Sequence, residues 1–302
     1  MNGVPGPARL AKRSAGAHIA AMIRPSLPQA LGLAAVGALF WAERRWPRRP
    51  VDAPDRVRRN LTLGATALAV AGGVGGPLNA VVARGNARAR DAGRARGLTG
   101  ALPAPVAAVA GFLLADYTIY LWHVATHKLP VLWRLHRIHH IDRALDTTTA
   151  VRFHAVDMLV SAPMDMARLR LIGAGPRVWA AWQAFFGLSV LFHHSNLALP
   201  DEWERRLNRV LTTPGMHDIH HRAAKAQTDS NWSSGLSVWD RLHRTFRTPG
   251  EQEWLAIGVA GYPRDLHIAD LTALPLEPTD DDWPDVDWPR EEADARIEAP
   301  TT

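Results

Sequence analysis

Long apolar runs along the 302-residue chain are separated by polar stretches that are rich in histidine. Three of the runs are almost free of charged residues and cover positions 27–41, 61–83 and 101–122. Because a helix needs about 20 apolar residues to cross a bilayer, the second and third runs are long enough and the first is marginal. The pattern favours an integral membrane helical protein over a soluble protein with buried helices.

Arginines flank these runs, as they do at membrane interfaces. Four lie between positions 44 and 49, after the first run, and five lie between 84 and 96, after the second. Since both connecting segments are basic, the positive-inside rule leaves the orientation undecided. The glycine-rich stretch 72–77 lacks the register of a nucleotide-binding loop, and we expect it to break the second helix.

A fourth apolar region covers positions 155–192 and contains a Gly-Ala-Gly-Pro turn at 173–176. Its first half carries four charged side chains, which are costly in hydrocarbon. We therefore expect an interfacial or re-entrant helix there. The second half, 178–192, returns the chain to the side where the histidines lie.

The composition excludes several kinds of site. The chain has no cysteine, so disulfides, thiolate metal sites and cysteine nucleophiles are absent. The net charge of +6 raises nucleic acid as a partner, but the arginines lie beside apolar runs, and we expect no nucleic-acid binding. The segment from 277 to 302 holds ten acidic residues and is expected to be a disordered tail.

Histidine is the residue type that points to chemistry, because twelve of the fourteen lie between positions 123 and 243. They form an HxxxH pair at 123 and 127 and two HxxHH clusters, at 136–140 and 217–221. On a helix, positions i, i+3 and i+4 share a face, so each cluster can offer neutral imidazoles to iron, zinc, copper or nickel. Their number exceeds what one ion can bind, which predicts a site for two metals.

The third and fourth apolar runs end directly before His123 and close to His194, so both helices deliver ligands to one membrane face. A substrate dissolved in the bilayer could reach a site in that position. We therefore expect an all-α fold, an integral membrane helical bundle with a His-rich helical cap that carries a di-metal site.

Several motifs match those of a known family in their order and approximate spacing. They are Asp116–His123 with His127, Leu132–His140, Thr148–His154, His194–Asn196, Thr213–His221, Asp229–Trp232 and Trp239–Leu242. From Gly111 to Thr248 the chain resembles the fatty acid hydroxylase superfamily, which includes sterol desaturases and sterol methyl oxidases. It departs from the family pattern at Val124, where Arg is usual, and at 154–157, where His-Pro-x-Glu is usual. It also departs at 231–233 and 242–244, where the family favours Asn-Tyr-Gly and Leu-Phe-Gly.

This resemblance implies two irons that activate O2 at the cytosolic face of a multi-pass membrane protein. It assigns nine histidines as catalytic metal ligands: His123, His127, His136, His139, His140, His194, His217, His220 and His221. His154 is added as a tenth metal ligand. Four carboxylates, those of Asp116, Asp218, Asp229 and Asp240, are candidates to accept from the outer imidazole N–H groups, and the alternative role for each is a helix cap or a surface charge.

The implied activity is that of a membrane-bound di-iron oxygenase, which hydroxylates or desaturates a C–H bond of a fatty acyl, sterol or other isoprenoid lipid. No flavin, nicotinamide or iron–sulfur motif is present, so we expect a separate electron donor, a ferredoxin or cytochrome b5-like protein with its reductase. The alternatives are a His-ligated zinc hydrolase of the membrane and a non-enzymatic metal transporter or sensor.

The expected domain organisation follows these segments. It consists of a basic N-terminal segment (1–26), N-terminal transmembrane helices (27–110), the di-iron domain (111–248), a C-terminal extension of that domain (249–276) and the acidic tail (277–302).

Overall fold

The computed structural model describes residues 26–51, 54–94, 96–248, 256–262 and 265–278. Within these residues the regular structure is helical, with isolated β-bridges and no strand, so the expected helical class is confirmed. The expectations for positions 1–25 and for the acidic tail from 279 onward lie outside the described residues. The chain divides into two units, 1–38 and 39–302, and α2 (Leu27–Arg45) begins in the first and ends in the second.

The glycine-rich stretch does not break the second apolar helix, and that expectation is wrong. Helices α3 (Pro54–Val70) and α4 (Gly76–Asp91) are joined by one π-helical turn, η1 (Ala71–Gly75). The backbone N–H of Gly76 donates to the carbonyl of Ala71, five residues earlier, so hydrogen bonding continues through the turn. A π turn is wider than an α turn and absorbs one extra residue without ending the helix.

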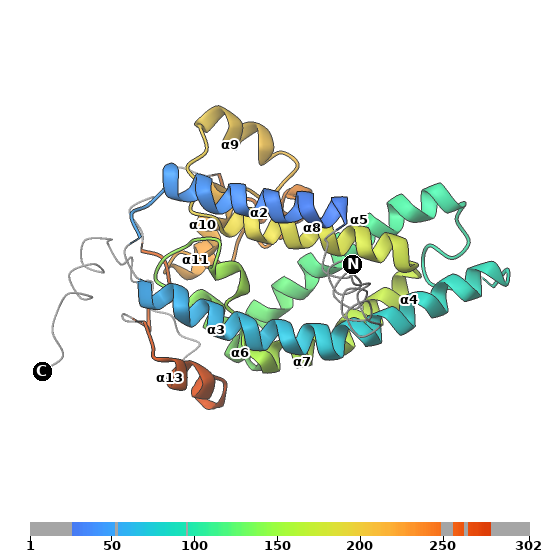
Figure 1. The fold of residues 1–302 in the computed structure, drawn as a ribbon, viewed down its shortest axis with the longest axis horizontal. Helices are drawn as coiled ribbons and strands as arrows, with labels where there is room; N and C mark the ends of the chain where they lie inside the picture. Colours follow the sequence, from blue (N-terminus) through green and yellow to red (C-terminus); the bar gives the residue numbers. More distant parts are fainter. Residues whose placement is uncertain (1–25, 52–53, 95, 249–255, 263–264, 279–302) are drawn as a thin grey trace, which may run out of the picture. The chain divides into compact units, whose positions relative to one another are not determined.

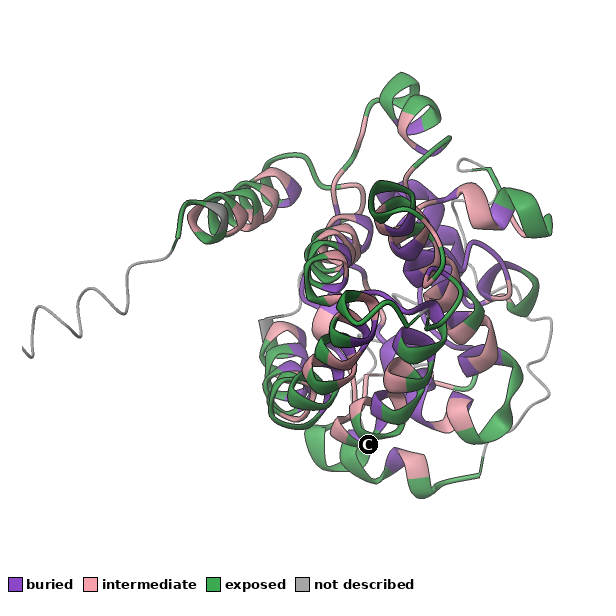
Figure 2. Cartoon of the chain, turned by 90° about the vertical axis from the view of Figure 1, so that its right-hand side faces the viewer, coloured by how far each residue is buried: buried purple, intermediate pink, exposed green. Residues whose placement is uncertain are grey.

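The described part of the chain contains two helices that are long and apolar enough to cross a membrane. One is the continuous helix Asp55–Asp91, and the other is α5 (Ala104–Lys128). They correspond to the second and third apolar runs, while the marginal first run is not among them. In the second unit, exposed residues line the outer faces of the helices and buried residues gather where helices face one another (Figure 2).

Helices α4, α5, α7 (Ala155–Ile172) and α8 (Pro176–His194) pack around an apolar core that includes Leu169, Ile172 and Trp182. Of the four charged side chains in the first half of the fourth region, Asp157 and Arg168 are buried in this bundle, whereas Arg170 is exposed. Arg168 of α7 donates to the carbonyl of Ala115 at 2.8 Å, and its guanidinium lies 4.4 Å from the Trp182 ring centroid. The charge therefore faces protein groups.

Eight shorter helices complete the part of the chain that the structure describes (Figure 1). They are α6 (Pro130–His140), η2 (Thr149–Val151), α9 (Asp201–Leu207), α10 (Pro214–His220), α11 (Lys225–Thr228), α12 (Val238–His243), α13 (Ile268–Ala273) and η3 (Leu274–Leu276). Helices α6 and α10 both begin with a proline. Proline suits the first helical position because the backbone N–H that it lacks would have no partner within the helix there. Both therefore start at fixed points close to the ends of longer helices.

Candidate metal centre

Four helices bring ten buried histidines together in one region. Helix α5 contributes two, α6 three, α8 two, and α10 with the residue that follows it three. The spacings of three and four residues place each set on one helix face, as the sequence predicts. Within this region the ring nitrogens separate into two quartets.

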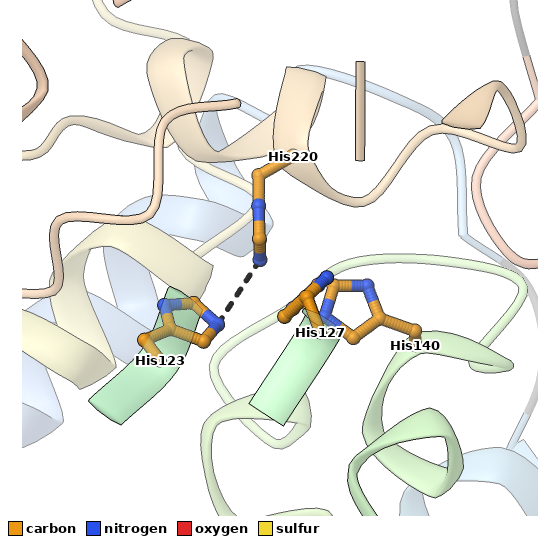
Figure 3. A group of neighbouring side chains, drawn as sticks. All are labelled: His123, His127, His140 and His220. Atoms are coloured by element: carbon orange, nitrogen blue, oxygen red, sulfur yellow. Dashed lines mark hydrogen bonds between the residues drawn. The ribbon is translucent and has the colours of Figure 1, made fainter. Parts of the chain in front are cut away.

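The first quartet consists of His123, His127, His140 and His220, whose ligand atoms all lie within 4.8 Å of one another. Figure 3 shows their rings converging, with His220 facing His123. The Nε2 atoms of these two residues are 3.2 Å apart. Four imidazoles from three helices therefore meet at one point.

The second quartet consists of His139, His194, His217 and His221, again with ligand atoms within 4.8 Å. The Nε2 atom of His194 lies 2.9 Å from that of His139 and 3.0 Å from that of His217. The two HxxHH clusters each supply both quartets, because neighbouring residues on a helix point about 100° apart. The rings of His140 and His221 stack at 4.3 Å, so the two quartets are adjacent.

Two buried histidines border the quartets, and one predicted ligand lies away from them. The His136 ring borders the first, at 5.1 Å from His123 and 5.0 Å from His127, between ring centroids. The buried His193 borders the second, 4.1 Å from the His217 ring, although the sequence did not select it. His154 is not brought to either quartet: its Nδ1 accepts from the backbone N–H of Val156, 3.1 Å away, at the start of α7.

The hydrogen bonds of the first quartet test whether it suits a cation. The Nδ1–H of His123 donates to the carbonyl of Trp232 at 2.7 Å, and the Nδ1–H of His220 donates to that of Ser230 at 2.8 Å. A neutral imidazole has one N–H, so both Nε2 atoms carry a lone pair. Two lone pairs that face each other at 3.2 Å repel, and a cation between them turns this repulsion into attraction.

The second quartet has the same feature at His194. Its Nδ1–H donates to the carbonyl of Val190 at 2.8 Å, which leaves a lone pair on Nε2. This lone pair faces the Nε2 atoms of both His139 and His217. The single lone pair of His194 can accept one hydrogen bond and not two. One metal ion, in contrast, can bind all three nitrogens.

Protonation does not relieve these contacts, because the rings stay neutral. Burial, together with neighbouring imidazoles, lowers the pKa of His139, His140, His220 and His221 well below the ordinary value of 6.5. Neutral, convergent nitrogen donors are what divalent iron, zinc or copper binds. Both quartets therefore fit a transition metal.

The outer N–H groups of three ligands, His123, His194 and His220, donate to backbone carbonyls, and the expectation of carboxylate partners is wrong for three of the four candidates. Asp116 accepts from the indole N–H of Trp239 at 2.7 Å, and Asp218 and Asp240 likewise bind other groups. Asp229 comes nearest, with an oxygen 4.0 Å from His127 Nδ1. A carbonyl fixes the ring orientation without burying another charge.

The turn that supplies two of these carbonyls is held by Asp240. Its carboxylate accepts from the backbone N–H groups of Trp232 and Ser233, both at 2.9 Å, and from the hydroxyl of Thr245 at 2.6 Å. Asn231, with a φ of 52°, donates to the carbonyl of Met216 at 2.9 Å. Asp240 and Asn231 thereby fix the carbonyls that orient the first quartet.

The segments that carry His194 and His217 are held by Arg49, which lies far before them in the sequence. Arg49 donates two hydrogen bonds to Asp218, which follows His217, at 2.7 and 2.8 Å. Its backbone N–H donates to the side chain of Asn196, two residues after His194, at 3.0 Å. The sequence places Arg49 among the arginines that flank the first apolar run, so this role could not be identified from position.

A buried network fixes the end of α6, from which His139 and His140 project. Arg56 donates to both oxygens of Asp142, at 2.5 and 2.9 Å, and both residues are 1% exposed or less. Arg152 donates to the carbonyl of Ile138 at 2.8 Å. The end of α6, which contributes a ligand to each quartet, is therefore anchored to α3 and to the segment after α6.

Comparison with known proteins agrees with this geometry. Residues 108–245 match the family model for fatty acid hydroxylase. Over 166 residues the chain is 31% identical to an ornithine lipid hydroxylase of Rhizobium tropici, a match that covers 54% of this chain and 48% of that protein. Over 138 residues it is 30% identical to the alkylglycerol monooxygenase of Xenopus tropicalis, covering 45% of this chain and 29% of the relative.

It is also 26% identical over 149 residues to cholesterol 25-hydroxylase of Homo sapiens, covering 45% of this chain and 49% of the relative. The chain thus spans half or less of the length of these curated relatives. No solved structure matches the chain with significance.

Proposed function

Because the chain belongs to the fatty acid hydroxylase superfamily through residues 108–245, we propose that it is a membrane-bound di-iron lipid hydroxylase that uses O2 and electrons from a separate donor. The observation that carries this proposal is the pair of adjacent quartets, in which imidazole lone pairs converge without a proton to share. Relatives of this chain are named hydroxylases and monooxygenases, which favours hydroxylation over desaturation.

We assign one iron to each quartet, with His136 as a further ligand beside the first. Two irons held there would supply the reduction of O2 and the oxidation of a C–H bond. The residues of the chain keep the imidazoles neutral, orient them through backbone carbonyls and exclude water by burial. His193 and His154 are left out of the ligand set, His154 because it binds the start of α7.

The membrane position follows from α5, whose last turns carry His123 and His127. With the apolar part of α5 and the helix Asp55–Asp91 in the bilayer, the quartets lie at the end of a membrane span. A lipid could then approach from the hydrocarbon phase. We place this end at the cytosolic face of a multi-pass protein, where a ferredoxin or cytochrome b5-like donor has access.

Metal analysis and product analysis together test the proposal. Protein purified anaerobically in mild detergent should hold two irons per chain, and lipids from cells that express it should gain 16 mass units, the mass of one oxygen. His127→Ala should lower the iron content, whereas His267→Ala, outside the site, should not. One tightly bound zinc without O2 consumption would favour a hydrolase or a sensor instead.

A further inference from the structure

An aromatic cluster lies on α5 immediately before the first quartet. Tyr117 and Tyr120 precede His123 at intervals of three residues, and their rings are nearly parallel at 6.3 Å. His243 at the end of α12 stacks on both rings, at 5.7 and 5.1 Å. Since Tyr120 is 2% exposed and His243 is exposed, the cluster leads from one helical turn before a ligand to the surface.

The two tyrosines have different hydrogen-bond partners. The Tyr117 hydroxyl lies 3.0 Å from Nε2 of His243, within the range for direct proton transfer to a base. The Tyr120 hydroxyl lies 3.1 Å from that of Thr245, which in turn donates to Asp240. The third tyrosine, Tyr262, accepts from the guanidinium of Arg137 at 2.8 Å and has a cation for a neighbour.

We propose that Tyr117 and His243 form a proton-coupled redox pair, through which oxidising equivalents leave the di-metal site when no lipid is bound. The proposal rests on the proposed oxygenase function, which supplies the oxidant. The Tyr117 phenol gives one electron, by way of Tyr120, to the oxidised metal site, and its O–H proton moves to Nε2 of His243. A neutral tyrosyl radical and an imidazolium result, and an external one-electron donor restores both.

The chemistry of phenol sets the direction of this route. A phenol gives up an electron only to a strong oxidant, so the pair does not carry reducing electrons inward from a carrier. Moving the proton to His243 avoids a phenol radical cation in partly apolar surroundings, where an uncompensated charge is costly.

The test uses iron-loaded, reduced, full-length protein in detergent, mixed with O2 in the absence of lipid and frozen for electron paramagnetic resonance. A tyrosyl signal is expected in the unmodified protein, is lost in Tyr117→Phe and falls several-fold in His243→Phe. Tyr262→Phe is the matched control and should keep the signal. Iron content and O2 uptake, measured on the same samples, should be equal in all four proteins.

A signal that survives Tyr117→Phe, or O2 uptake without any tyrosyl signal, would overturn the pair. Absence of O2 uptake in every protein would instead count against the proposed function. A second arm separates the two cases: metal-free protein is oxidised by light with a ruthenium photo-oxidant and persulfate. Greater oxidation at Tyr117 than at Tyr262, dependent on His243, supports the pair, and equal oxidation refutes it.

Discussion

Replacement of Arg49 by glutamine should weaken metal binding at the second quartet by about 10–100-fold and leave binding at the first quartet unchanged. Arg49 holds Asp218 with its side chain and Asn196 with its backbone, and these residues neighbour His217 and His194. The turn that orients His123 and His220 is held by other residues, Asp240 and Asn231. The substitution should therefore change metal affinity at the second quartet and not at the first.

The size of the effect follows from the pair that is lost. Arg49 and Asp218 form a bidentate pair with side chains 12% and 2% exposed. Asp218 keeps Arg222 at 2.8 Å, so it is not left as an unpaired buried charge, and we expect a loss of about 2 kcal/mol instead of the larger penalty for isolating a charge. Loss of an outer support lowers metal affinity by about 10–100-fold, which is the same range of free energy.

Anaerobic titration of metal-free protein with ferrous iron, against a chelator of known affinity, measures both sites. The unmodified protein should bind two ions, and Arg49→Gln should bind one with unchanged affinity and the other about 10–100-fold more weakly. Arg44→Gln, at an exposed position in the last turn of α2, is the control and should bind both. Equal weakening of both ions, or of neither, would refute the separate support of the quartets.

Four further expectations follow from the site. Asp240→Asn should weaken the other ion in the same titration, because an amide presents a donor to one of two backbone N–H groups and loosens the turn at Ser230. His193→Ala should retain two irons by metal analysis, and a lost iron would make His193 a ligand. His220→Ala should abolish lipid oxidation with helix content unchanged by circular dichroism. Burial lowers the pKa of His220 in the folded state, so as the pH falls through about 6.5 the unfolded state binds a proton that the folded state does not. The metal-free protein should therefore have constant stability above about pH 7 and lose stability below about pH 6.5. A thermal-unfolding midpoint that does not change from about pH 8 to about pH 5 would contradict this.

The two apolar spans and the histidine clusters were accessible to sequence reasoning because both depend on short-range periodicity. The i, i+3, i+4 spacing correctly predicted that the imidazoles of each cluster share a region. It did not predict that His139 and His140 serve different quartets, since this depends on the direction from which α8 and α10 approach α6. Local spacing thus gives the candidates, and tertiary packing divides them.

No local sequence pattern identifies the residues that hold the ligands in place. Arg49 and Asp218 are 169 positions apart. Glu43 accepts from the backbone N–H groups of Thr147 and Asn196, which are 104 and 153 positions away. Arginine beside an apolar run has an interfacial explanation that is sufficient without any partner. Only the fold reveals that this segment braces the second quartet.

The π turn between α3 and α4 has a consequence for how this helix can vary in length. Buried residues on α3 fall at 56, 60, 63, 64 and 67, and an uninterrupted α-helix would continue that stripe at 74 and 78. The stripe instead resumes at Gly75 and Asn79, one residue late, and reaches Asn86, which donates to the carbonyls of Leu169 and Ala174. The turn is thus a one-residue phase correction, so homologous helices shorter by one residue here would keep the same side toward α7, and those shorter by two would rotate it away.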